Sequence, residues 1–186
     1  MFIHKIEEDL ALKLIELRDA ERVFELTNNS RAYLREWLSW LDFTTKMEDS
    51  QAFIKNSLKS FPENKSLSTV ILFKGEIVGV AGFNEMNWSN KTAYIGYWLG
   101  EEYQGNGIMT KVARALTDYA FSELNLNKVE IRVASGNKKS AGIPEKLGFV
   151  KEGSIRQAEW LYDHYVDHVV YGMLAVEWKE ACLKNM

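Results

Sequence analysis

One stretch of this sequence decides the fold, Gln104-Gly105-Asn106-Gly107-Ile108-Met109-Thr110. It follows the apolar run Ile95-Gly96-Tyr97-Trp98-Leu99, which has the composition of a strand. After it, apolar residues recur at helical spacing. A strand, a glycine loop and a helix N-terminus in this order leave backbone N–H groups free to bind an anion, and the helix dipole favours negative charge beside them. The stretch therefore predicts a site for a ligand that carries a pyrophosphate.

Two other kinds of phosphate-binding loop do not fit this stretch. A P-loop has a lysine directly after its second glycine, but Asn106 stands there although Gly100 and Gly105 have the right spacing. A dinucleotide-binding loop needs a third glycine, and Thr110 occupies that position. A plain strand-to-helix turn that uses glycine for a positive φ angle stays open as the alternative.

A second glycine-marked element lies downstream, and together the two elements resemble those of a known family. It consists of Asn137-Lys138-Lys139-Ser140, followed by Glu145-Lys146-Leu147-Gly148-Phe149. The upstream loop resembles the Gln/Arg-x-x-Gly-x-Gly/Ala signature of the GNAT superfamily of acetyl-CoA-dependent N-acetyltransferases. Gln104 and Gly107 fill the first two fixed positions of that signature, whereas Met109 replaces the small third residue.

One branch of the superfamily is especially similar, the RimJ/RimL-type enzymes that acetylate the N-termini of ribosomal proteins. The similarity covers Gly96-Tyr97-Trp98-Leu99 and residues 103–110, and members of this branch tolerate a larger residue at the position of Met109. Asn137 and Ser140 match the same branch downstream.

The resemblance implies a single N-acetyltransferase domain over residues 1–186 with the α/β (α+β) GNAT fold. Its centre would be a mixed, mostly antiparallel sheet of seven strands flanked by helices, with a splay between strands four and five. Apolar runs in this sequence predict strands at residues 10–15, 68–73, 77–83, 92–99, 129–133, 149–155 and 165–174. Helices are predicted from Asp19 to about residue 26, from Ser30 through residue 38, from Thr45 or Asp49 to before Pro62, at 108–120 and at 140–147.

The predicted site binds acetyl-CoA as a co-substrate and holds no metal. The glycine loop would bind the pyrophosphate, and the open edge of the strand before it would pair with the amides of the pantetheine arm. For that edge to be open, the strand at 129–133 must diverge from it, as the corresponding GNAT strands do. The residues predicted to bind acetyl-CoA are Trp98, Leu99, Gln104, Gly105, Asn106, Gly107, Ile108, Met109, Thr110 and Asn137.

Two residues are predicted to take part in catalysis. The resemblance implies that Ser140 is the acid that protonates the leaving thiolate, and the alternative is that it caps the helix at 141–147. Tyr94 stands where relatives often carry a glutamate, and a tyrosine is a poor base at neutral pH. Glu85, directly or through a water, is the predicted substitute, with a solvated turn carboxylate as the alternative. An N-terminal α-amine has a pKa of about 8 and needs little help from a base.

Composition narrows the class of protein further. With 186 residues and 46% apolar side chains, the chain can bury one core. It has no apolar run long enough to cross a membrane, no signal-peptide pattern at Met1 and a single cysteine, Cys182. These features predict a cytoplasmic protein without a membrane partner. The net charge of −3 predicts no nucleic-acid partner.

Two groups of residues look like sites but are interpreted otherwise. His164 and His168 would share a helix face, yet the residues around them have the pattern of a strand. A strand would separate their Cα atoms by about 13 Å, too far for one metal. Trp37, Trp40, Trp88 and Trp160 are interpreted as core, and the alternative is that the first three grip a peptide N-terminus.

The predicted function is transfer of an acetyl group to the N-terminal α-amine of a protein or peptide, with ribosomal proteins as candidates. An alternative acceptor is a polyamine or an aminoglycoside, which needs acidic residues around its pocket. The residues available for that are Glu36, Asp42, Glu48 and Asp49. A second alternative is a CoA-binding sensor with weak catalysis, suggested by Tyr94. The sequence leaves open which acceptor is used and whether the protein is a homodimer.

Overall fold

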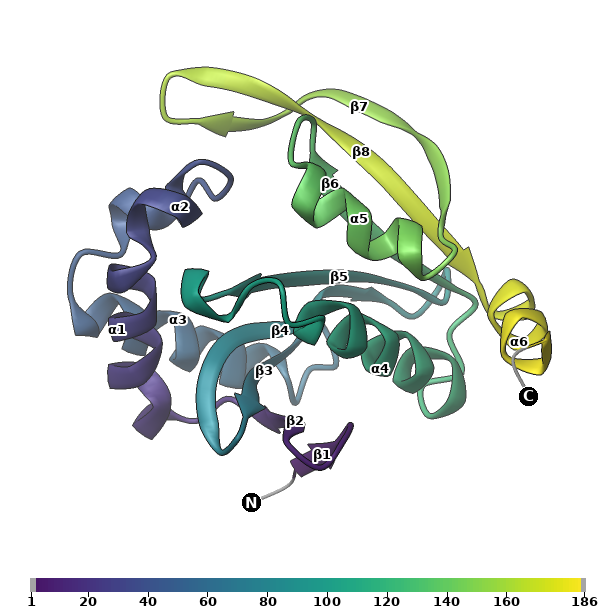
Figure 1. Ribbon diagram of the computed structural model, residues 1–186, viewed down its shortest axis with the longest axis horizontal. Coiled ribbons are helices and arrows are strands. Elements are labelled where there is room, and N and C mark those ends of the chain that lie inside the picture. The colour runs from purple at the N-terminus through teal and green to yellow at the C-terminus, as the bar shows by residue number, and fades with distance from the viewer. Residues whose placement is uncertain (1–2, 185–186) are drawn as a thin grey trace.

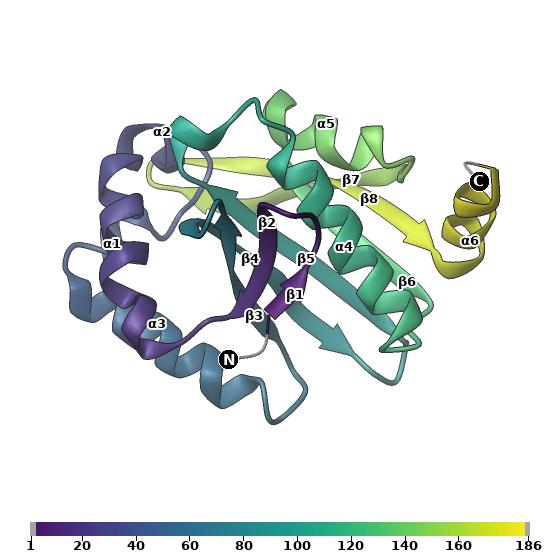
Figure 2. The same ribbon diagram turned by 60° about the horizontal axis from the view of Figure 1, so that its bottom comes forward.

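The computed structural model describes residues 3–184, which form one sheet with helices on both faces (Figures 1 and 2). The strands are β1 (Ile3–Lys5), β2 (Leu10–Leu14), β3 (Leu67–Phe73), β4 (Glu76–Asn87), β5 (Thr92–Leu99), β6 (Lys128–Ala134), β7 (Val150–Leu161) and β8 (His164–Leu174). The α-helices are α1 (Ala20–Asn29), α2 (Arg31–Arg35), α3 (Met47–Ser60), α4 (Ile108–Ser122), α5 (Lys138–Lys146) and α6 (Ala175–Lys184). Short 3-10 helices are η1 (Leu17–Asp19), η2 (Leu41–Phe43) and η3 (Glu101–Tyr103).

The eight strands follow the order β1-β2-β3-β4-β5-β6-β8-β7 across the sheet. Only β5 and β6 run parallel to each other, and all other neighbours are antiparallel. This arrangement is the mixed, mostly antiparallel sheet that the sequence predicted.

Two apolar cores form on the two faces of the sheet. α4 packs on one face, where Ile108, Val112 and Leu116 are buried as their spacing predicted. α1 and α3 pack on the other face around Val23 and Ile54. Each buried side chain of this size stabilises the fold by about 1.5–3 kcal/mol. The packing of α4 thereby fixes the glycine loop at its N-terminus against the end of β5.

The sheet opens between β5 and β6, which confirms the predicted splay. The two strands pair from Thr92 with Lys128 to Ile95 with Ile131, and their pairing ends there. Residues 96–99 of β5 continue to pair with β4, while the rest of β6 pairs with β8. The edge of β5 that faces β6 is therefore open directly before the glycine loop.

The prediction of seven strands is wrong by one strand. β1 pairs with β2 at the edge of the sheet, and all three of its residues are exposed. A strand that is exposed on both faces has no alternation of apolar residues to mark it. α6 was not predicted either, because it follows β8 without a glycine or proline between them; it buries Trp178.

Helix boundaries differ from the predictions near the site. α2 ends at Arg35, so Trp37 and Leu38 lie after the helix in which they were predicted. Asn137 is the N-cap of α5, because its side-chain oxygen accepts a hydrogen bond from the Ser140 N–H at 3.0 Å. The alternative role of Ser140 as the cap of this helix is therefore wrong.

Candidate functional site

The glycine loop joins β5 to α4 in a conformation that requires glycine. Gly105 and Gly107 have φ angles of 78° and 70°, in the left-handed region. A side-chain carbon at either position would meet nothing within 4 Å, so the space beside the loop is open. The Asn106 amide donates to the carbonyl oxygens of Tyr103 and Gln104 at 3.1 and 3.2 Å and stabilises the loop from within.

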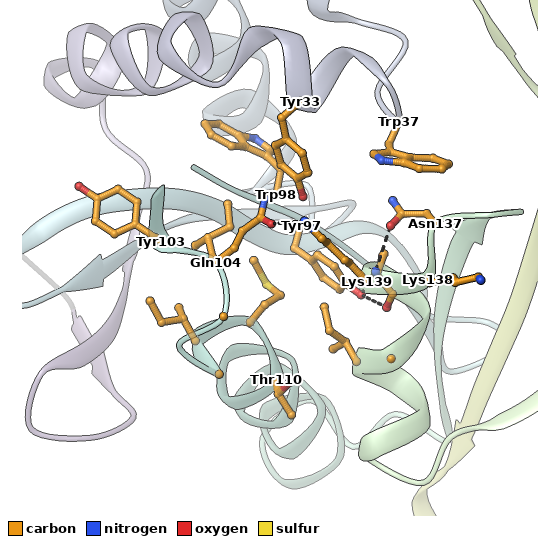
Figure 3. A pocket seen from close by; sticks show the side chains of 18 of the residues that line it. Tyr33, Trp37, Tyr97, Trp98, Tyr103, Gln104, Thr110, Asn137, Lys138 and Lys139 are labelled. Carbon is orange, nitrogen blue, oxygen red and sulfur yellow. Dashed lines mark hydrogen bonds between the residues drawn. The ribbon is translucent and has the colours of Figure 1, made fainter. Parts of the chain in front are cut away.

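A cavity of about 610 Å³, which we call the first cavity, lies beside this loop (Figure 3). Its size is typical of small-molecule sites, which occupy about 300–1,000 Å³. Figure 3 shows Tyr33 and Trp37 pointing into it from α2 and the segment after α2. The predicted acetyl-CoA residues on its lining are Trp98, Leu99, Gln104, Gly105, Gly107, Ile108, Met109, Thr110 and Asn137. Ser140 also lines the first cavity, whereas Asn106 does not.

The lining of the first cavity favours an anion. Lys138, Lys139 and Lys146 contribute positive charge, and no Asp or Glu side chain is among the lining residues. α4 and α5 both begin at the cavity, and their N-termini carry partial positive charge. This combination suits the phosphate groups of a ligand.

Gln104 supplies an additional polar group to the first cavity. Its side-chain oxygen accepts a hydrogen bond from Lys139 at 3.0 Å. Its amide lowers the pKa of the Tyr33 hydroxyl, although burial raises that pKa more. The buried Gln104 Nε2 nevertheless has no hydrogen-bond partner of normal geometry among residues 3–184.

Tyr97, which was not predicted to be a site residue, has its hydroxyl beside Ser140. It is 3.3 Å from Ser140 Oγ and 3.4 Å from the Ser140 carbonyl oxygen. Burial raises the pKa of Tyr97 well above its ordinary value, so the phenol is neutral and can donate to Ser140. The two residues are 43 positions apart, and only the fold brings them together.

A second cavity, of about 380 Å³, lies on the face of the sheet that α1 and α3 cover. It meets the first cavity at Leu38, Tyr97 and Trp98, which line both. Two cavities that meet at one strand edge suit a reaction between two substrates. The acidic residues predicted for a polyamine pocket line neither cavity: Glu36, Asp42, Glu48 and Asp49.

Glu85, the residue predicted to act as the base, lies on β4 outside both cavities. Its side chain is exposed, and its partner across the strands is Tyr94. Tyr94 is mostly buried, and burial raises the pKa of its hydroxyl, which makes it a still poorer base.

Replacing Glu85 by glutamine is expected to leave kcat and KM nearly unchanged, because the exposed side chain lies outside both cavities. Steady-state kinetics of Glu85→Gln beside the wild type would show this. A loss of activity of 100-fold would contradict the placement of Glu85 outside the site and restore it as the base.

The β7–β8 hairpin is tied to the segment after α2, near which its tip lies in Figure 1. Glu159 accepts a hydrogen bond from Ser39 at 2.6 Å and contacts His168 Nε2 at 3.0 Å. The Tyr162 hydroxyl donates to the Leu38 carbonyl oxygen at 2.5 Å. Since Leu38 lines both cavities, this tie helps to position the wall that they share.

Acid is expected to weaken the contacts of Glu159 with Ser39 and His168. The hydrogen bonds from His168 and Ser39 lower the pKa of Glu159 below the ordinary value of 4.5. A carboxylate with a lowered folded-state pKa contributes stability above the unfolded pKa, and this is lost as pH falls through the folded value. Thermal unfolding between pH 7 and pH 3 should therefore lower the Tm of the wild type more than that of Glu159→Gln. The exposed control Glu85→Gln should follow the wild type, and equal losses in all three proteins would contradict this account.

His164 and His168 both lie on β8, as the strand pattern predicted, and among residues 3–184 no group of three or more His, Cys, Asp or Glu side chains could hold a metal ion. The interpretation of four tryptophans as core is wrong. Trp37 and Trp40 are half-buried and line the first and second cavities respectively, and Trp88 and Trp160 are 43% and 49% exposed. Within the same residues, no helix is long and apolar enough to cross a membrane.

Comparison with known proteins identifies the family. Residues 9–150 match the Acetyltransferase (GNAT) domain, so the chain belongs to this family of acetyltransferases, as the glycine loop predicted. A relative in Bacillus subtilis (strain 168), the putative ribosomal N-acetyltransferase YdaF, is 33% identical over 180 residues, which cover 96% of this chain and 98% of the relative.

Two solved structures share the fold and contain coenzyme A or acetyl-CoA. RimL, a ribosomal L7/L12 alpha-N-protein acetyltransferase in complex with coenzyme A, aligns with a TM-score of 0.90 at 26% identity over 93% of this chain and 98% of its own. The microcin C7 self-immunity acetyltransferase MccE, in complex with acetyl-CoA and AMP, aligns with a TM-score of 0.87 at 31% identity over 91% of this chain and 94% of its own. The predicted GNAT fold and the resemblance to the RimJ/RimL branch are confirmed.

Proposed function

We propose that this enzyme transfers an acetyl group from acetyl-CoA to the N-terminal α-amine of a protein, with ribosomal proteins as the first candidates. The observation that carries the proposal is the junction of the two cavities at Tyr97 and Trp98. The first cavity has the charge and backbone of a CoA site, and the second meets it from the other face of the sheet. The names of YdaF and RimL, both of which refer to ribosomal acetylation, support the choice of acceptor.

The residues of the first cavity fit acetyl-CoA along its length. The glycine loop, the N-terminus of α4 and the lysines would bind its phosphates. The open edge of β5 at residues 96–99 would pair with the amides of the pantetheine arm. The thioester would then lie near Tyr97 and Ser140, where the second cavity begins.

The chain provides the groups that the reaction requires. As the amine nitrogen bonds to the thioester carbonyl carbon, a backbone N–H on the open edge of β5 donates to the carbonyl oxygen. The C–S bond breaks while Ser140 Oγ gives its proton to the sulfur. The proton released by the amine returns to Ser140 through solvent, and Tyr97 holds the Ser140 hydroxyl in place. Because an α-amine has a pKa of about 8, about a tenth of it is neutral at pH 7 without a base.

A polycationic acceptor is less well supported, because its additional ammonium groups would need carboxylates. Asp42 forms an ion pair with Arg35 at 2.8 Å. Asp49 accepts hydrogen bonds from the Thr45 and Lys46 N–H groups at the start of α3. Glu36 is exposed and lines neither cavity. In a pocket without carboxylates, the ammonium groups of a polyamine lose their water and gain no partner in its place, which is unfavourable.

Several features of the proposed enzyme stay predictions. They are the extent of its single domain over residues 1–186, its cytoplasmic location, its independence of metal, nucleic acid and membrane, and its assembly as a monomer or homodimer.

The acceptor can be tested with labelled acetyl-CoA and a panel of ribosomal proteins, polyamines and aminoglycosides. We expect label to appear on one or more ribosomal proteins and on none of the polycations. Label on spermidine or an aminoglycoside alone would contradict the proposed acceptor. CoA binding without transfer to any acceptor would instead favour the sensor.

A further inference from the structure

We propose that the second cavity receives an uncharged, mostly apolar group of the acceptor, next to the amine that is acetylated. This inference rests on the proposed function and specifies its substrate class. A protein acceptor would carry a large apolar side chain on its first residue, because that side chain is nearest to the α-amine.

The lining of the second cavity includes two glycines that face each other across β4 and β5. Gly82 pairs with Gly96, and both lie on the face of the sheet toward α1 and α3, as do Val80 and Trp98 two residues away. The space beside each glycine is taken by a neighbour, and a side-chain carbon at Gly96 would overlap the Asn84 side chain. A side-chain carbon at Gly82 would overlap the Leu67 carbonyl oxygen, so a larger residue cannot occupy that position without moving the backbone.

The lining of the second cavity carries no charged side chain. Its large walls are apolar and include Trp40 and Phe53. Its polar members are small and neutral, such as Thr44, Ser50 and Asn84. A charged group that enters such a space loses its water and gains no partner, which is unfavourable. The cavity therefore disfavours lysine, arginine and acidic side chains and the distant ammonium of a polyamine.

The volume of the second cavity favours a large group. Its 380 Å³ compares with about 30 Å³ for one water molecule in the liquid. The side chain of serine or alanine would leave most of this space to water, whereas leucine or phenylalanine would displace that water from the apolar walls. In a hydrophobic pocket, one methylene changes discrimination between substrates about 10- to 200-fold.

The junction of the cavities places this group relative to the chemistry. Tyr97 lines both cavities and contacts Ser140, so the second cavity opens where the thioester would end. A side chain one bond from the carbon that carries the α-amine can enter it while the nitrogen stays at the junction.

Acetylation of five peptides that differ only in residue one tests this inference. With leucine, phenylalanine, serine, lysine and aspartate at that position, we expect kcat/KM for leucine and phenylalanine to exceed that for serine by about tenfold or more. Lysine and aspartate should fall below serine. Equal rates for all five, or a preference for serine, lysine or aspartate, would overturn the inference but not the proposed function.

Two small amines separate a failure of the inference from a failure of the proposed function. 2-Phenylethylamine carries an apolar group, whereas spermidine carries further charges. If no peptide is acetylated but 2-phenylethylamine is preferred to spermidine, the protein acceptor is wrong and the inference about the cavity stands. Preference for spermidine, or transfer to neither amine and no peptide, would overturn the inference.

A matched pair of variants assigns the selectivity to this cavity. Asn84→Asp adds a negative charge to the lining with little change of shape, and because the side chain is partly open to solvent the protein should tolerate the charge. In Asn84→Asp, we expect the rate for the lysine peptide relative to the leucine peptide to rise about tenfold, because the new carboxylate attracts the lysine ammonium at close range. Asn87→Asp lies on the same strand outside the cavity and should leave the ratio unchanged. An identical ratio in both variants would overturn the inference.

Discussion

Gly107→Val is expected to lower the affinity for CoA about tenfold or more while the protein stays folded. Gly107 has a φ angle of 70°, which a β-branched residue adopts only at a cost of about 1–3 kcal/mol. The loop can relieve this strain by turning its peptide groups, and the N–H groups then no longer converge on the phosphates. Calorimetric titration with CoA would measure the loss, and circular dichroism would show that the fold persists.

Gly75→Val is the matched control for this variant. Gly75 has a φ angle of 86° and open space around it, but it lies in the turn between β3 and β4, outside both cavities. The substitution should cost similar stability and leave CoA affinity unchanged. If folded Gly107→Val binds CoA as tightly as the wild type, the glycine loop does not bind the phosphates.

Ser140→Ala is expected to lower kcat by about 100- to 10,000-fold, the usual contribution of a general acid, and to leave CoA affinity nearly unchanged. This substitution removes the hydroxyl and leaves the N-cap of α5 intact. The N-cap of α5 depends on Asn137 and on the Ser140 backbone N–H, which alanine retains. Only the hydroxyl near Tyr97 is removed.

Ser122→Ala provides the control for Ser140→Ala. The Ser122 hydroxyl donates to the Asp118 carbonyl oxygen on the exposed side of α4, so its loss should leave turnover unchanged. Full turnover in Ser140→Ala would show that another group, or water, protonates the thiolate.

Most of the sheet and the helix after the glycine loop could be predicted because their signals are local. Ile108 and Val112 repeat at helical spacing, and Gly75 marks a hairpin. β1 gave no such signal because its residues are exposed. The end of α2 at Arg35 was also missed, although the position of Leu38 at both cavities depends on it.

The CoA side of the site could be predicted because its residues lie close together in the sequence, from Trp98 to Thr110. The acceptor side could not, because it depends on strand register. Gly82 and Gly96 are separated by a turn, and only the pairing of β4 with β5 places them opposite each other. Glu85 looked like a possible base because a sequence does not show that a register shift follows Phe83 and that the carboxylate faces solvent.

The central claim, transfer of acetyl to an α-amine, is tested most directly by locating the acetyl group on a modified ribosomal protein by mass spectrometry of its peptides. Such a protein offers one α-amine with a pKa of about 8 and several lysine amines with a pKa of about 10.4, which are mostly protonated at pH 7. We expect the added acetyl group on residue one alone. Acetyl groups found only on internal lysines would contradict the account.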